Sequence, residues 1–94
     1  MDTVKFTPEF VLAAVNANMT KASKASDELL RLANIDYINS QTGLDVANEV
    51  KTYLTKAYEL LDLVDIPETK ATQFAIGAAI TRQNTIIRNI ELSL

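Results

Sequence analysis

The side chains that could take part in bond chemistry are few, and the sequence contains neither histidine nor cysteine. Their absence removes the cysteine nucleophile, the commonest general base, zinc sites of the Cys/His type and the serine triad. Carboxylates are the remaining candidates, because Asp62, Asp65 and Glu68 are spaced by threes across a proline-containing turn. A calcium loop needs alternating oxygen ligands and a glycine, which this spacing lacks. We interpret the three acids as a solvated turn followed by charges at a helix start.

The sequence also lacks the residue patterns of phosphate-binding and di-iron sites. A phosphate-binding loop needs several glycines close together, and the two glycines of this chain stand far apart. A di-iron bundle needs glutamates with a histidine three positions later, which the chain cannot supply. A small-ligand carrier would need a pocket lined by carboxylates or by the tyrosines Tyr37, Tyr53 and Tyr58. We predict no catalytic, cofactor-binding or metal-binding residue, no cofactor and no enzyme activity.

The charges are balanced and dispersed, with 9 basic and 12 acidic residues giving a formal charge of -3. No basic cluster could neutralise a row of phosphates, so the sequence argues against binding to nucleic acid or to an anionic membrane. No apolar run is long enough to span a bilayer, and no cleavable signal peptide pattern is present. We expect a soluble protein, and the sequence does not indicate its compartment.

The composition predicts an all-α fold. Hydrophobic residues make up 48% of the 94 residues, and only two glycines and two prolines interrupt them. This length suits one domain, 1–94, with a short flexible N-terminal lead at 1–6. We predict an antiparallel helical hairpin or a three-helix bundle, with helices at about 8–38, 43–64 and 67–92.

The first helix should begin at Thr7-Pro8-Glu9, which supplies a hydroxyl cap, a proline in the first turn and an early acid. Its weak point is Asn16–Thr20, which is rich in poor helix formers. A break there would give four helices, but we predict one long helix.

The central helix should organise the bundle. Its apolar residues recur in alternating steps of three and four, and a second apolar row lies beside the first. Such a wide apolar face predicts a helix placed between two others. Thr42 followed by Asp45 resembles a capping box at its start. The first row is Ala47, Val50, Leu54, Ala57, Leu61 and Val64, and the second is Val46, Tyr53 and Leu60.

The last helix should start at Pro67, because proline lacks a backbone donor and disfavours a helical residue before it. A kinked helix that continues through Pro67 is the alternative. The small residues Ala71, Ala75 and Ala79 recur every four positions. They either line a contact within the molecule, as in ridge-and-groove packing, or form a contact between copies of the protein.

Gln83 interrupts an aliphatic stripe on this last helix. Two interpretations are open: a hydrogen-bonded buried amide that fixes the helix register, or a stripe that faces a wet protein interface. The branched aliphatics near the chain end favour a helix that docks onto another protein. The stripe consists of Ile76, Ile80, Ile87, Ile90 and Leu94, and the candidate protein-contact residues are Ala71, Ala75, Ala79, Ile80, Arg82, Gln83, Ile87 and Ile90.

Two short resemblances concern secretion proteins. Residues 65–68 (DIPE), followed by residues 73–75 (QFA), resemble the proline-containing hairpin of type III secretion needle subunits, although the last helix ends sooner and departs from their spacing. The first helix, residues 42–45 (TGLD) and the central helix resemble the small helical companions of type VII secretion effectors. The W-x-G motif of that wider group is missing here, and Pro67 interrupts where their second helix continues. Neither resemblance assigns a family or transfers a site residue.

These patterns favour a non-catalytic structural, assembly or adaptor protein that acts through helix–helix contacts. Its partners would be other protein subunits, with self-association in a homo-oligomer or a multi-subunit particle such as a virion or secretion component. The alternative is a small helical regulator that binds and blocks one target protein, such as a phage-encoded inhibitor or a secretion chaperone.

Overall fold

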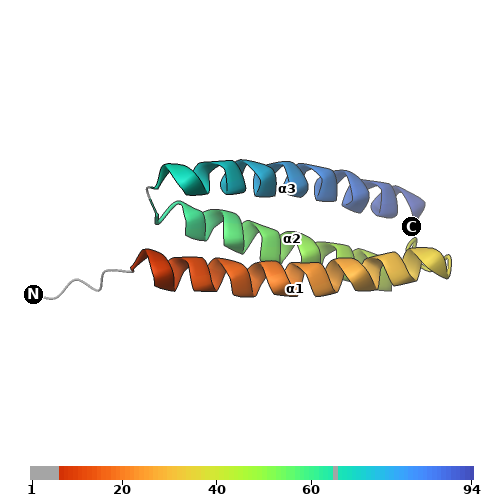
Figure 1. The fold of residues 1–94 in the computed structure, drawn as a ribbon. Helices are drawn as coiled ribbons and strands as arrows, with labels where there is room; N and C mark the ends of the chain where they lie inside the picture. The colour runs from red at the N-terminus through yellow and green to blue at the C-terminus, as the bar shows by residue number, and fades with distance from the viewer. Residues whose placement is uncertain (1–6, 65) are drawn as a thin grey trace, which may run out of the picture.

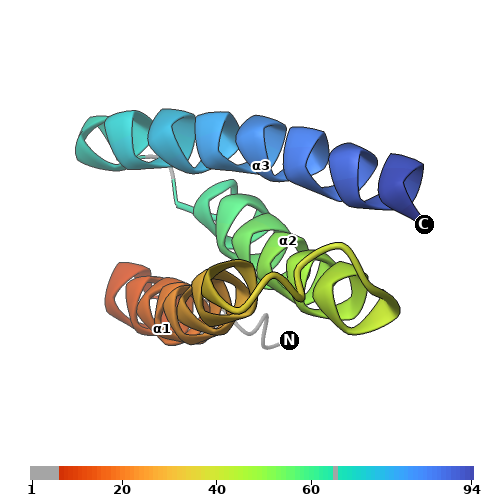
Figure 2. The same cartoon turned by 90° about the vertical axis from the view of Figure 1, so that its right-hand side faces the viewer.

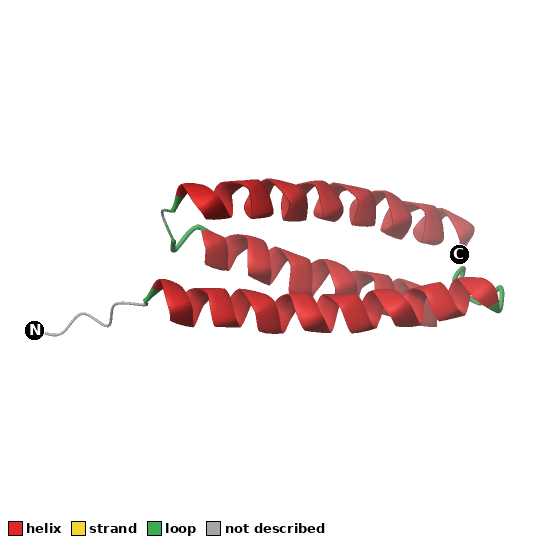
Figure 3. Ribbon diagram, in the orientation of Figure 1, coloured by secondary structure: helices red, strands yellow, loops and turns green. Residues whose placement is uncertain are grey.

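The computed structural model describes residues 7–64 and 66–94, and the predicted N-terminal lead lies outside them. The described chain is all-α, as predicted, with three helices: α1 (Pro8–Asn34), α2 (Gln41–Leu61) and α3 (Pro67–Ser93). They follow one another in antiparallel order (Figure 1), and Figure 3 shows that loops are confined to the connections and the ends. The bundle is elongated, measuring 53 × 21 × 19 Å.

Helix α2 is the centre of the bundle. It packs against both α1 and α3, whereas the backbones of α1 and α3 do not approach each other within the described chain. Figure 2 shows α1 and α3 on different sides of α2. Every residue of the first apolar row predicted for this helix is buried, from Ala47 to Val64. Since full burial of one leucine or valine contributes roughly 1.5–3 kcal/mol, this row contributes strongly to the cohesion of the bundle.

The core is divided along the length of the bundle. One cluster joins all three helices near the α2–α3 turn, and includes Val15, Leu61 and Ile76. A second, smaller cluster near the other end contains Leu29, Ala47, Ile87 and Ile90. Together they hold α1 and α3 along most of the length of α2.

Helix α1 is continuous, which confirms the prediction of one long helix through Asn16–Thr20. In that segment the Asn18 amide donates to the Ala14 carbonyl oxygen at 2.9 Å, and the Thr20 hydroxyl donates to the Asn16 carbonyl oxygen at 3.0 Å. Each bond reaches back four residues, so these polar side chains are accommodated without interrupting the helix.

The predicted end of the first helix at residue 38 is wrong, because α1 stops at Asn34. Asp36 adopts a left-handed backbone conformation with φ of 56°. The Asp36 N–H donates to the Ala33 carbonyl oxygen at 3.1 Å, and the Tyr37 N–H donates to the Leu32 carbonyl oxygen at 2.7 Å. This pair of bonds is a Schellman termination, here built on aspartate where glycine is usual.

The predicted cap of the central helix at Thr42 is also wrong. Helix α2 begins at Gln41, and the Ser40 hydroxyl accepts a hydrogen bond from the Gly43 N–H at 3.0 Å. Gly43 is buried against the preceding turn. A Cβ added there would lie 1.8 Å from the Ile38 carbonyl oxygen. The turn therefore folds back onto the first turn of α2 so closely that only glycine fits.

The connection between α2 and α3 is a true break, which rules out a kinked continuous helix. Helix α2 ends at Leu61, three residues before the predicted Val64, although Val64 still packs into the core. Ile66 has extended backbone angles, φ of -122° and ψ of 126°, and α3 starts at Pro67 as predicted. Proline enforces this geometry because it disfavours a helical conformation at the residue before it.

Candidate functional site

In the described part of the chain, the acids at the α2–α3 turn include Asp62 and Glu68. Among the described residues, no group of three or more acidic side chains could hold a metal ion. Asp65 lies outside those residues, and Glu68 is in the first turn of α3. Asp62 has a different role, since its Oδ1 accepts a hydrogen bond from the Gln73 amide at 2.6 Å. The same amide donates to the Tyr58 carbonyl oxygen at 3.2 Å. Gln73 thus fastens α3 to the end of α2.

The three tyrosines occupy separate places. Tyr37 is exposed in the connection between α1 and α2, and Tyr58 lies beside Gly77 of α3. The Tyr53 ring is between two lysines, with the Lys21 ammonium 5.7 Å and the Lys56 ammonium 5.8 Å from its centroid. Both distances are within the range of cation–π attraction. Tyr53 and Tyr58 line different surface depressions, so they do not build a common ligand pocket.

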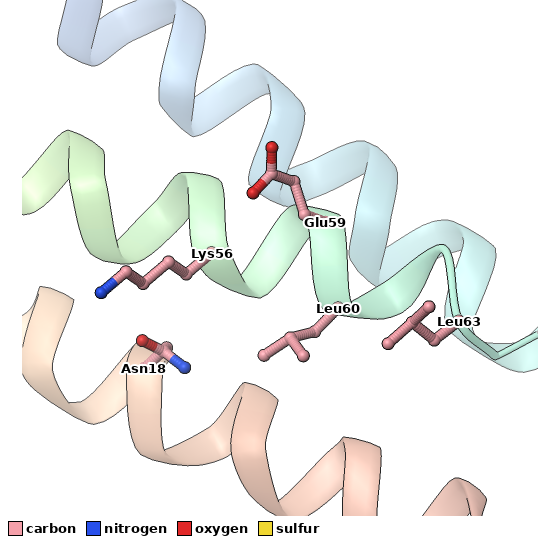
Figure 4. Close-up of a pocket in the computed structure, with 5 residues that line it drawn as sticks. All are labelled: Asn18, Lys56, Glu59, Leu60 and Leu63. Atoms are coloured by element: carbon pink, nitrogen blue, oxygen red, sulfur yellow. The ribbon is translucent and has the colours of Figure 1, made fainter. Parts of the chain in front are cut away.

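A depression of about 330 Å³ lies between α1 and the C-terminal part of α2 (Figure 4). Leu60 and Leu63 form its apolar side, and Asn18 faces them from α1. Glu59 also borders the depression, but Figure 4 shows its carboxylate pointing away from Asn18. An enclosed ligand site has a few polar groups that converge on one point. The Glu59 carboxylate does not converge with Asn18 on one point, so we assign no ligand to this depression.

The predicted protein-contact residues divide into an inner and an outer group. Gln83, Ile87 and Ile90 are buried, while Ile80 and Ala79 are half-buried and pack on the core. The outer group consists of Ala71, Ala75 and Arg82, which are exposed. The aliphatic stripe of α3 is therefore largely occupied by α2 within one molecule. Contact of any of these residues with another protein stays a prediction.

In the folded chain, Gln83 is a hydrogen-bonded buried amide, the first of the two interpretations. Its Nε2 donates to the Ala47 carbonyl oxygen of α2 at 3.0 Å, and the side chain is buried. Among the described residues, no buried side-chain nitrogen or oxygen lacks a hydrogen-bond partner. A hydrogen bond from the Gln83 side-chain amide therefore joins the middle of α3 to α2 and fixes the register of the two helices.

The outward side of α3 carries apolar surface. Phe74 is 80% exposed, and Leu92 near the chain end is also exposed. Phe74 borders a depression of about 300 Å³, whose other walls include Tyr58 and Gly77. No charged residue occurs from Ala71 to Thr81. This face was predicted only in part, because sequence periodicity singled out the alanines and not Phe74.

Charge pairing is concentrated elsewhere. On the solvent side of α1, Arg31 donates two hydrogen bonds to the Glu28 carboxylate, at 2.9 and 2.6 Å. The hydrogen bonds from Arg31 lower the pKa of Glu28, and the carboxylate in turn raises the pKa of Arg31. Both side chains are well exposed, so the pair contributes little to stability.

Comparison with known protein families, curated proteins and solved structures identifies no match to this chain. Among the described residues, no helix combines the length and the apolar character needed to cross a lipid bilayer.

Proposed function

We propose that this chain is a non-catalytic helical assembly or adaptor protein, and that it acts through helix–helix contacts made by the outward side of α3. The observation that carries the proposal is Phe74, exposed over 80% of its surface within a segment that has no charged residue from Ala71 to Thr81. A solvent-facing helix surface usually carries charged and polar residues, and a helix that is apolar on several sides is usually buried.

The placement of α3 supports this proposal. Helix α3 contacts α2 along one side and its backbone does not approach that of α1 in the described chain, so much of its circumference is left free of intramolecular packing. Large exposed aromatic side chains are enriched in protein interfaces, where they bury area with little loss of conformational entropy. The absence of histidine and cysteine supports the non-catalytic part of the proposal.

The test uses Phe74→Glu, with Leu30→Glu on α1 as the matched control, because Leu30 is also exposed, at 62%. Both variants should keep their helical circular dichroism, since neither side chain belongs to the core. Proteins captured by the tagged chain from its native host are identified by mass spectrometry. We expect Phe74→Glu to capture the specific partner at a level about tenfold below wild type, as for an interface hot spot. Leu30→Glu should capture it at the wild-type level.

Equal capture by the two variants would remove α3 as the contact surface. A one-to-one complex with a single target protein, whose activity the chain inhibits, would favour a regulatory role over an assembly role. Substrate turnover by the purified chain would overturn the non-catalytic part of the proposal.

A further inference from the structure

A second stripe of residues runs along α3 beside the one that packs on α2. Three of its members come one position before a buried residue. One position corresponds to about 100° around a helix, so the second stripe is rotated by about 100° from the packed one. Its members follow each other in alternating steps of three and four, the spacing of a coiled-coil seam. This alanine stripe consists of Glu68, Ala71, Ala75, Ala78 and Arg82.

The alanine stripe is open to solvent. Four of its residues are exposed, and Ala78 is half-buried. Three consecutive members are alanines, whose small side chains allow another helix to approach to the short end of the usual interaxial range of about 8–10 Å. Phe74 lies one position before Ala75 and adds exposed apolar surface along the edge of the stripe.

The charges at the ends of the stripe select one kind of partner. Glu68 lies seven residues before Ala75, and Arg82 lies seven residues after it. Seven residues span about 10.5 Å of helix, so the two charges are equidistant from Ala75. Within the described part of the chain, neither side chain has an ion-pair partner.

The charges of the alanine stripe are complementary to those of an identical stripe that runs in the opposite direction. A second α3, antiparallel and crossing at Ala75, would place Glu68 level with Arg82 of the second copy, twice by symmetry. A parallel second copy would instead bring glutamate to glutamate and arginine to arginine, which is repulsive. A two-fold symmetric contact of this kind is the commonest form of homo-oligomer interface.

We propose that two copies of this chain pair through antiparallel contact of their alanine stripes, centred on Ala75 and oriented by the two Glu68–Arg82 pairs. The inference rests on the proposed function, because it names the partner of α3 as a second α3. Association of the two chains buries the alanines and covers Phe74, which leaves the α1–α2 pair on the outside of the dimer.

The test is sedimentation equilibrium at low ionic strength of wild type, Glu68→Arg and Arg82→Glu. Each single reversal turns both symmetric pairs into repulsive ones, and we expect dimerisation about tenfold weaker for each variant. An equimolar mixture of the two variants should recover wild-type affinity, because each contact in the mixed dimer joins glutamate to arginine. The double reversal in one chain should recover it as well.

The matched controls are Lys70→Glu and Glu91→Arg, which make the same changes of charge on other sides of α3. They should dimerise like wild type, and all variants should keep wild-type circular dichroism. Wild type that stays monomeric at millimolar concentration would overturn the pairing, and so would single reversals that dimerise as well as the controls.

The outcomes separate this inference from the proposed function. A monomeric chain whose captured partner is lost on Phe74→Glu would overturn self-pairing and leave the contact role of α3 intact. Loss of both the dimer and the partner on Phe74→Glu would support the two proposals together.

Discussion

The two helices that flank α2 are attached to it by different chemistry. All six buried residues of α1 are apolar: Val11, Val15, Ala22, Ala25, Leu29 and Leu32. Three of the six buried residues of α3 are polar, namely Thr69, Gln73 and Gln83. Burial of aliphatic side chains is favourable without regard to direction, whereas a buried amide contributes little net free energy and must meet a partner at a fixed place.

The difference assigns separate tasks to the two pairs of helices. Helices α1 and α2 each bury more apolar side chains than α3, and they are joined by a tight turn with hydrogen-bonded caps. Helix α3 has fewer buried aliphatics, and its position along α2 is fixed by two amides, Gln73 at the turn and Gln83 in the middle. This arrangement places α3 accurately while leaving its other sides available, which is what the proposed contact role requires.

The largest expected effect concerns the α1–α2 turn. Gly43→Ala puts a Cβ within 1.8 Å of the Ile38 carbonyl oxygen, a backbone atom that cannot move without opening the turn. We expect the free energy of unfolding to fall by about 3 kcal/mol, at the upper end of typical overpacking effects. Urea denaturation followed by circular dichroism measures the loss. A variant as stable as wild type would show that this turn does not constrain the packing of α1 against α2.

An intermediate effect is expected at the polar attachment of α3. Gln83→Ala removes buried packing volume, and we expect a loss of about 2 kcal/mol. Gln83→Leu should stay within about 1 kcal/mol of wild type, because it keeps the volume and leaves no buried donor unpaired.

Leu29→Ala is the matched truncation on α1, with an expected loss of about 3 kcal/mol. Chemical denaturation of the three variants gives the ranking. If Gln83→Ala destabilised the protein more than Leu29→Ala, the proposed division between the two pairs would be reversed. If Gln83→Leu were as unstable as Gln83→Ala, the hydrogen bond would be the main contribution of Gln83.

The smallest effect is expected at the other glycine, which sharpens the contrast with Gly43. A Cβ at Gly77 would lie 3.1 Å from a ring carbon of Tyr58, a partly exposed side chain that can move aside. Alanine is favoured over glycine by about 1 kcal/mol in a helix interior, so Gly77→Ala should raise stability by up to that amount. The thermal midpoint of unfolding measures the change, and a fall comparable with that of Gly43→Ala would mean that the Tyr58 ring is held rigidly.

Much of the fold could be predicted from the sequence because it depends on periodicity. The apolar row of α2 predicted both the burial of its members and the position of that helix between two others. The start of α3 at Pro67 followed from the covalent structure of proline. The ends of the helices near Asn34 and Leu61 were predicted too late, since apolar residues continue past them into the turns.

The candidate site was less predictable. The alanines at 71 and 75 were identified by their spacing, but the exposure of Phe74 was not, because an isolated aromatic residue in a helix is usually buried. The bond from Gln73 to Asp62 was missed because it joins residues that no local motif relates. Ser40, rather than Thr42, caps α2 for a similar reason: both hydroxyls suit the position, and the chain's path through the preceding turn decides between them.

The sequence by itself determined which residue types are present, where apolar stripes lie and where proline starts a helix, because these properties are local and periodic. Only the tertiary structure decided which stripe of α3 faces α2, which polar side chains meet across the helices and why position 43 must be glycine. Those outcomes depend on distances between segments far apart in the chain, and the pattern of one segment does not encode its distance from another.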